Sequence, residues 1–211
     1  MNYKINRYLD HAVLKPELTV EEVKEAIQMG IDYKVKTVCV RPCDIDLAVE
    51  MCRNTETEVA CVLAFPHGVS LSEIKAEEAK YYISKGVKEI DMVANYSYIK
   101  SKKWDLVKKD IEVVTSQTRI SDVLLKVIIE TAMLNLEEVA KATEIAIEAG
   151  ADFVKTSTGF YGEGATEQAV KVMLDTAAGR IKVKPSGGIR DFNRAKMFID
   201  MGCHRLGVGY T

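Results

Sequence analysis

The sequence predicts an α/β protein whose parallel strands close into a (β/α)8 barrel. Short runs rich in β-branched residues alternate with longer amphipathic stretches along the whole chain, which is typical of a parallel sheet with crossover helices. Runs such as VLLKVIIE (123–130) are almost continuously apolar, as expected for a strand covered on both faces. Eight such runs are present, and eight strands close this kind of barrel.

The predicted strands recur from one end of the chain to the other. They are the segments 9–14, 36–41, 58–65, 88–95, 123–130, 151–157, 180–186 and 204–209. No Pro/Ser-rich linker or low-complexity segment interrupts the alternation, so residues 1–211 are expected to form one domain. An open doubly wound sheet is the alternative fold, but its G-x-G-x-x-G fingerprint is missing.

The segments between the strands carry helix start and stop signals. Thr19 with Glu22 and Ser70 with Glu73 have the spacing of capping boxes, which predicts helix starts. Four glycines each follow a helical pattern and precede a strand, where a left-handed residue is expected to end the helix: Gly30, Gly86, Gly150 and Gly202.

The last predicted strand has no helix after it in the sequence. The chain ends at Thr211, directly after segment 204–209, so the eighth covering helix is expected to be missing. Something else must shield this strand. The N-terminal segment, a neighbouring subunit and a longer native chain are all compatible with the sequence, and a homodimer is one expectation that follows.

Composition and charge exclude several classes of protein. The chain has 211 residues, of which 47% are hydrophobic, and its net charge of −2 offers no positive field for nucleic acid or acidic lipid. No apolar run is long enough to span a membrane, and the N-terminus lacks a signal-peptide core, so we expect a cytoplasmic protein. Five cysteines without a CxxC pair favour reduced thiols over disulfides. Three scattered histidines without an acidic cluster predict no metal site.

Charged residues interrupt four of the predicted strands. They are Asp91, Lys126, Lys155 and Lys184, each among apolar neighbours. A lysine that faced the helix layer would be buried without a partner at a cost of several kcal/mol, so these side chains are expected to point into the barrel. One such lysine alone is better explained by a structural ion pair or by an amine that reaches solvent. Three together favour a common site at the strand ends.

Lysines and an acid in one dry pocket indicate imine chemistry. A lysine near its reference pKa of about 10.4 is protonated at neutral pH and cannot attack a carbonyl. Burial and a neighbouring ammonium both lower that pKa, and a shift of roughly 3 units corresponds to about 4 kcal/mol. A neutral amine can form an imine that acts as an electron sink, while a carboxylate moves protons. This is the chemistry of a class I aldolase.

Glycines near the last two strands indicate where an anionic substrate group binds. Gly187 and Gly188 follow the seventh strand and precede a helix, while Gly207 and Gly209 lie in the eighth. Backbone N–H groups at this place commonly hold phosphate in barrels. The alternative interpretation is that these glycines only allow the chain to turn and bind no ligand.

The chain also resembles the deoxyribose-phosphate aldolase family. The resemblance covers nearly the whole length, through LDHAVLKP, TVCVRP, AFPHG, EIDMVAN, KVIIETAML, ADFVKTSTGF, GAT and VKPSGGIR. It implies reversible cleavage of 2-deoxy-D-ribose 5-phosphate to D-glyceraldehyde 3-phosphate and acetaldehyde in a barrel without metal or organic cofactor. By resemblance, Lys155 is the imine-forming nucleophile, Lys184 lowers its pKa, and Asp91 is the proton-transfer acid/base.

The resemblance also implies a set of substrate-binding positions. Asp10 matches an acid that helps to hold substrate hydroxyls, and Lys126 belongs to the same charged group. The positions expected around the sugar and phosphate are Thr158, Gly159, Gly187, Gly188 and Gly207.

The eighth strand departs from the family pattern. A pair of phosphate-binding serines commonly follows the glycine there, whereas Gly207 is followed by Val208, Gly209 and Tyr210. The loss of two hydroxyl donors predicts weaker phosphate binding, unless Tyr210 supplies a contact. Two alternative functions therefore stay open: a related Schiff-base aldolase for a different or unphosphorylated aldehyde, and an inactive barrel that binds sugar phosphates.

Overall fold

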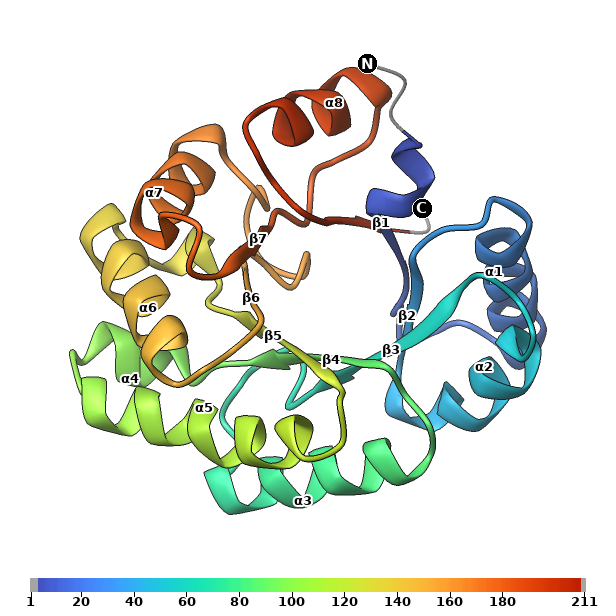
Figure 1. The fold of residues 1–211 in the computed structure, drawn as a ribbon, viewed down its shortest axis with the longest axis horizontal. Coiled ribbons are helices and arrows are strands. Elements are labelled where there is room, and N and C mark those ends of the chain that lie inside the picture. The colour runs from blue at the N-terminus through green and yellow to red at the C-terminus, as the bar shows by residue number, and fades with distance from the viewer. Residues whose placement is uncertain (1–3, 210–211) are drawn as a thin grey trace.

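Eight parallel strands line the centre of the molecule in the computed structural model, which describes residues 4–209 (Figure 1). The strands are β1 (Leu9–Val13), β2 (Thr37–Val40), β3 (Glu58–Leu63), β4 (Glu89–Val93), β5 (Leu124–Ile128), β6 (Phe153–Lys155), β7 (Lys182–Lys184) and β8 (Leu206–Gly209). Each lies within one of the predicted segments. The predicted barrel is therefore confirmed.

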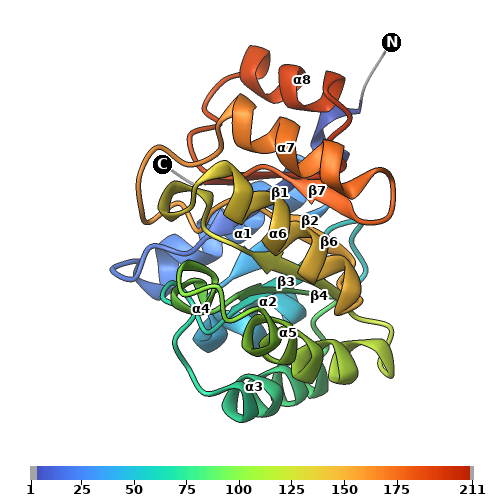
Figure 2. The ribbon, with the colours of Figure 1, turned by 90° about the vertical axis from the view of Figure 1, so that its left-hand side faces the viewer.

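Helices surround the strands on the outside of the ring (Figures 1 and 2). They are α1 (Val20–Asp32), α2 (Ile45–Cys52), α3 (Ser72–Ser84), α4 (Tyr96–Lys100), α5 (Trp104–Arg119), α6 (Leu136–Glu148), α7 (Glu167–Ala177) and α8 (Phe192–Asp200). Three 3-10 turns accompany them: η1 (Ile5–Tyr8), η2 (Pro42–Asp44) and η3 (Thr131–Met133). Both α4 and α5 follow β4, so these eight helices belong to seven crossovers.

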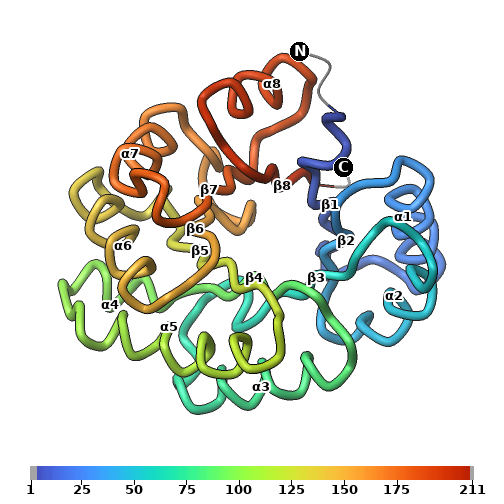
Figure 3. The backbone as a smooth tube through the Cα atoms, in the orientation of Figure 1, coloured from blue at the N-terminus to red at the C-terminus, as the bar shows by residue number. Residues whose placement is uncertain are grey.

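The strands form one sheet in the order β7-β6-β5-β4-β3-β2-β1-β8. Within residues 4–209 the ring closes between β7 and β8 through a single bridge, Ser186 to Gly207. The Gly207 N–H also donates to the Pro185 carbonyl at 2.9 Å. The tube trace shows β7 and β8 side by side at this closure (Figure 3). Every other pair of neighbouring strands shares three to five paired residues.

Side chains along each strand point alternately to the apolar core between strands and helices and to the inside of the ring. Ile90 and Met92 belong to the large apolar cluster between strands and helices, whereas Asp91 between them is buried outside that cluster. The same alternation places Leu125 and Val127 with the helices and Lys126 inside the ring. The apolar core thus holds the helices on the barrel, and the charged positions are turned inward.

Strand β8 is the last element of the described residues. The turn η1 lies on the outside of the ring between α8 and α1, beside β8 (Figure 1). Ile5 of η1 and Val208 of β8 both pack against the apolar core. The N-terminal segment therefore covers part of the strand, which is one of the three alternatives that the sequence allowed.

One predicted capping box is present and the other is not. Thr19 caps α1 with Glu22 in a full capping box. The pair of Ser70 and Glu73 was a wrong prediction, because α3 begins at Ser72 with Leu71 as its N-cap. The hydroxyl of Ser72 donates instead to Asp110 on α5 at 3.0 Å, so a contact between helices replaces a local cap.

Three of the four predicted glycine stops have the expected left-handed backbone, at positions 86, 150 and 202. The prediction for Gly30 is wrong, because this residue lies inside α1. A Cβ atom there would lie 2.5 Å from a methyl group of Val38, so glycine allows the helix to approach β2 closely. The left-handed residue after α1 is Lys34, with φ of 52°.

Candidate active site

Asp91 is the centre of a charged cluster inside the barrel. It lies on β4 and is completely buried. Its Oδ2 atom accepts from Lys155 on β6 and from Lys184 on β7, both at 2.7 Å, and its Oδ1 atom accepts from Lys126 on β5 at 2.7 Å. Burial alone would raise the pKa of Asp91, but the three ammonium groups outweigh it and hold that pKa well below its usual range.

Lys155 and Lys184 share one carboxylate oxygen but differ in their tendency to lose a proton. Burial is the main cause that lowers the pKa of the Lys155 amine; Asp91 opposes the shift and the Lys184 ammonium adds to it. Burial also acts on Lys184, but Asp10 and Asp91 outweigh it and raise the Lys184 pKa above its ordinary value. Lys155 is therefore the amine poised to act as a neutral nucleophile, beside a lysine that stays charged.

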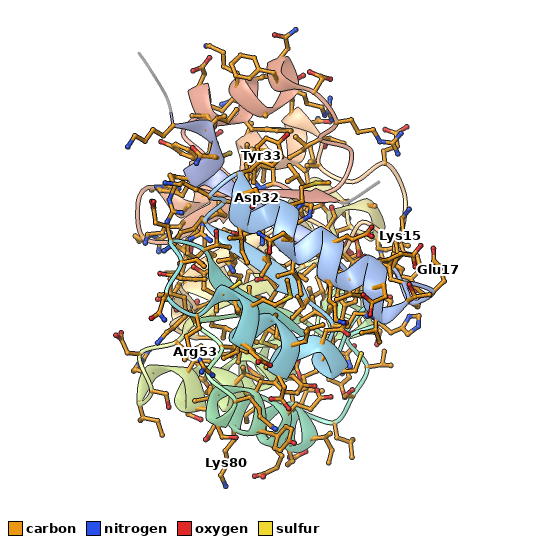
Figure 4. The ribbon with its side chains drawn as sticks, turned by 90° about the vertical axis from the view of Figure 1, so that its right-hand side faces the viewer. Lys15, Glu17, Asp32, Tyr33, Arg53 and Lys80 are labelled. Carbon is orange, nitrogen blue, oxygen red and sulfur yellow. The ribbon has the colours of Figure 1, made fainter. Side chains whose placement is uncertain are left out.

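A cavity of about 570 Å³ opens above this cluster, at the carboxyl ends of the strands. Asp10, Lys155 and Lys184 line its floor. Lys15, in the loop after β1, lies at its rim. Figure 4 shows this loop at one end of the barrel and Arg53, after α2, at the opposite end. A substrate in the cavity can thus reach the Lys155 amine directly, as expected for a barrel enzyme.

We call the three cavity-lining groups Asp10, Lys155 and Lys184 the upper layer. Beneath them lie the groups that the cavity does not reach, Glu89, Lys126 and Arg205, which we call the lower layer. Asp91 joins the two. Lys126, predicted to bind substrate, is fully buried and contacts Asp10, Glu89 and Asp91 instead.

The turn after β7 forms part of the cavity wall. Gly187 and Gly188 have left-handed backbones with φ of 79° and 73°, and their N–H groups donate to no acceptor within residues 4–209. A Cβ atom on Gly164 would lie 2.4 Å from the Gly187 backbone, so the loop after β6 packs directly on this turn. Two free N–H groups beside the N-terminus of α8 make this wall suitable for an anion.

Gly207 contributes space rather than a hydrogen bond. Its N–H already donates to Pro185, and a Cβ atom on it would lie 2.5 Å from the Ser186 side chain. Gly209, two residues further along β8, is exposed and lines the same cavity. Tyr210, the residue predicted to replace a lost phosphate contact, lies outside the described residues.

The loop after β6 is anchored by a buried carboxyl group. The N–H and the hydroxyl of Thr158 donate to Glu130 Oε2, at 3.1 and 2.6 Å. The Thr158 hydroxyl also accepts from the Phe160 N–H, so the geometry assigns this side chain mainly to the loop. Gly159 follows with a left-handed backbone and nothing within 4 Å of a built Cβ atom, which leaves the cavity open beside it.

A second contact holds the same loop to the loop after β3. The rings of Phe65 and Phe160 meet edge to face with centroids 5.1 Å apart. Beside them the Tyr161 hydroxyl and His67 Nδ1 are 2.6 Å apart. These aromatic groups hold the loop after β6 against the loop after β3.

A model of the family described as DeoC/LacD family aldolase matches residues 4–201. The chain belongs to this aldolase family. It is 45% identical over 205 residues to a deoxyribose-phosphate aldolase of Clostridium tetani, with 97% of this chain and 94% of that protein covered.

Solved structures give the same result for the aldolase fold. The structure of "QR15, an Aldolase" has a TM-score of 0.91 at 41% identity and covers 96% of this chain and 90% of its own. The tetrameric deoxyribose phosphate aldolase from Aeropyrum pernix has a TM-score of 0.89 at 25% identity, with 97% of this chain and 86% of that chain covered.

Three acidic or basic groups of this aldolase site were missed in the sequence: Glu89, Glu130 and Arg205. Glu89 and Arg205 stand at or just before strand starts, where charged residues usually face solvent, so nothing local marks them as buried. A signal for Glu130 was available, because it ends the apolar run VLLKVIIE within the family motif KVIIETAML.

Among the described residues of the aldolase, no group of three His, Cys, Asp or Glu side chains is arranged to hold a metal ion. All five cysteines are free thiols. Cys39 lines the cavity, and burial raises its pKa to about 12. In residues 4–209 no helix is long and apolar enough to cross a membrane.

Proposed function

We propose that this chain cleaves 2-deoxy-D-ribose 5-phosphate reversibly to D-glyceraldehyde 3-phosphate and acetaldehyde through an imine on Lys155. The observation that carries the proposal is the buried Lys155 amine, which lines the cavity, has a lowered pKa and lies against the same carboxylate oxygen as Lys184. The relatives named deoxyribose-phosphate aldolase, at 42–46% identity, support the substrate.

The reaction begins when neutral Lys155 Nζ attacks the aldehyde carbon C1 of the open-chain sugar. Loss of water from the carbinolamine gives an iminium ion, which draws electrons from the C2–C3 bond. As the C3 hydroxyl gives up its proton, this bond breaks to an aldehyde and an enamine. Protonation of the enamine at C2 and hydrolysis release acetaldehyde and restore the amine.

Lys184 and Asp91 serve the proton transfers in this proposal. Lys184 lines the cavity and keeps its proton, so it can protonate the departing water of the carbinolamine. Asp91 Oδ2 contacts both amines and can pass a proton between them without reaching the substrate itself. Asp10 accepts from Thr37 and from the lower layer, and its second oxygen contacts Lys184, which fixes that amine at the cavity floor.

The glycine turn is proposed to bind the phosphate. The free N–H groups of Gly187 and Gly188 supply two donors on the cavity wall, and the N-terminus of α8 adds a favourable dipole. Gly159 and Gly207 leave space for the sugar between this turn and Lys155. Thr158 is proposed to hold the loop that bounds this space through its contacts with Glu130.

The proposal is tested by trapping the imine. Limited acetaldehyde with a brief borohydride reduction should add one ethyl group to the protein, and proteolysis followed by mass spectrometry should locate it on Lys155. The variant Lys155→Met should gain no adduct at that peptide, while surface lysines react equally in both proteins. An ethyl group absent from Lys155 in the unaltered chain would remove the basis of the proposal.

We also propose that residues 1–211 act as one domain, in the cytoplasm, as a homodimer without nucleic-acid or membrane partners. Exposed apolar side chains on and next to α3, Leu71, Ile74 and Tyr81, offer a surface for a second copy. Light scattering coupled to size exclusion measures the oligomeric state, and a single cooperative unfolding transition would support one domain.

A further inference from the structure

The charged cluster inside the barrel extends below the groups that touch the cavity. Arg205 donates from one nitrogen to Asp10 at 2.6 Å and to Glu89 at 2.8 Å, and from the other nitrogen to Glu89 at 3.0 Å. Lys126 contacts the same Glu89 carboxylate as well as Asp91. Each of these side chains is at most 6% exposed, so water screens the cluster little.

The cluster contains one more basic group than acidic groups. Its carboxylates are Asp10, Glu89 and Asp91, and its basic groups are Lys126, Lys155, Lys184 and Arg205. With every group ionised, the buried cluster would hold a net charge of 4 − 3 = +1. An unbalanced buried charge is costly, so the cluster favours the loss of one proton.

The contacts decide which proton is lost. Arginine keeps its proton in proteins. Lys126 is within ion-pair distance of three carboxylates and Lys184 of two, whereas Lys155 contacts only Asp91 among the described residues. Lys155 therefore gives up the fewest ion pairs when it becomes neutral. The neutral amine is the state that the proposed reaction needs.

Two other groups lie near the Lys155 amine. The Cys39 thiol is buried and stays protonated, because burial raises its pKa to about 12. Glu130, at the barrel mouth, is held by Thr158 and makes no ion pair with the four basic groups among the described residues. Burial also raises the pKa of Glu130, and its carboxyl group contacts Thr158 rather than a member of the cluster, so we count Glu130 outside the cluster.

We propose that Glu89 and Arg205 are positioning residues whose opposite charges set this balance and thereby fix the pH at which Lys155 becomes a nucleophile. The inference rests on the proposed imine at Lys155. Neither side chain lines the cavity, so both act through Lys126, Asp10 and Asp91.

The two charges predict opposite effects. Glu89→Gln removes an anion and raises the formal surplus to two positive charges, so Lys155 should lose its proton at lower pH. Arg205→Met removes a cation and the surplus with it, so Lys155 should keep its proton to higher pH. The double variant restores a surplus of one and should return the midpoint close to that of the unaltered protein. Shifts of about one pH unit are expected for single buried charges at this range.

The experiment measures the rate of Lys155 ethylation by acetaldehyde and cyanoborohydride across pH, from the mass of the Lys155 peptide. The unaltered chain, both single variants and the double variant are compared, with Arg205→Lys as a control that keeps the charge. Opposite shifts in the single variants and a restored midpoint in the double variant support the inference. Equal midpoints, or shifts in the same direction, overturn it.

The inference remains testable if one or both single variants fail to fold. If one single variant fails to fold, the direction of the other decides; if both fail, the double variant decides, because a midpoint displaced from that of the unaltered chain contradicts charge balance. A chain in which Lys155 is never ethylated at any pH refutes the proposed function instead, so the two failures are distinct.

Discussion

The upper and lower layers of the barrel interior are built from the same kinds of side chain but have different freedom to change charge. In the lower layer, Lys126 contacts three carboxylates and Arg205 contacts two, so both cations are fixed. In the upper layer, Lys155 contacts one carboxylate oxygen among the described residues, and it shares that oxygen with Lys184. The comparison teaches that the reactive amine is the one with the fewest charged partners, although it too is buried.

The largest effect is expected from the upper layer. Lys155→Met should lower kcat by at least about 10⁴-fold, because the covalent step loses its only nucleophile. Acetaldehyde release from 2-deoxyribose 5-phosphate measures the loss, and circular dichroism checks the fold. Substantial turnover in this variant would show that Lys155 is not the nucleophile.

Lys184→Met is expected to lower kcat by about 10²–10³-fold, the range typical of a lost acid or base. It should also move the acid limb of the pH profile to higher pH. Lys155 acts in its neutral form, so activity appears as pH rises through its pKa, and removal of the adjacent cation raises that pKa. Lys182→Met, on the same strand but exposed, is the matched control and should leave the limb in place.

A change in the cavity wall should leave both layers intact. Gly188→Ala puts a Cβ atom 2.8 Å from the Glu163 carbonyl at a left-handed position, which displaces the turn. The preference for 2-deoxyribose 5-phosphate over 2-deoxyribose, measured as kcat/KM, should fall by about tenfold or more. Gly179→Ala, also left-handed but with nothing within 4 Å, controls for backbone strain; an equal loss there would contradict the role of the turn.

The smallest effect is expected from the helix layer. Asn135 caps α6 in a full capping box with Glu138. Asn135→Ala should lower the free energy of unfolding by about 1 kcal/mol, and Asn135→Ser should recover most of it. Urea denaturation measures both. Neither variant should shift the pH profile, since a shift would show that charge tuning is not confined to the barrel interior.

Periodicity and local charge were enough to predict the strands and the three residues Asp91, Lys155 and Lys184. Each of these is a charge inside an apolar strand, which is unusual without a partner. Glu89 and Arg205 gave no such signal, because they stand at strand starts and meet only when the barrel closes, 116 positions apart in the chain. Gly30 shows the same limit, since its role depends on how closely α1 approaches β2.

Within residues 4–209, a single bridge between Ser186 and Gly207 joins β7 to β8, and we call this junction the seam of the barrel. Widening the ring anywhere else would break a ladder of several paired residues, whereas opening it here disrupts the fewest strand hydrogen bonds. The seam adjoins the glycine turn and the cavity, beside Lys184. Substitutions that widen the cavity for bulkier aldehydes are therefore best introduced at this junction, where a wider ring disrupts the fewest strand hydrogen bonds.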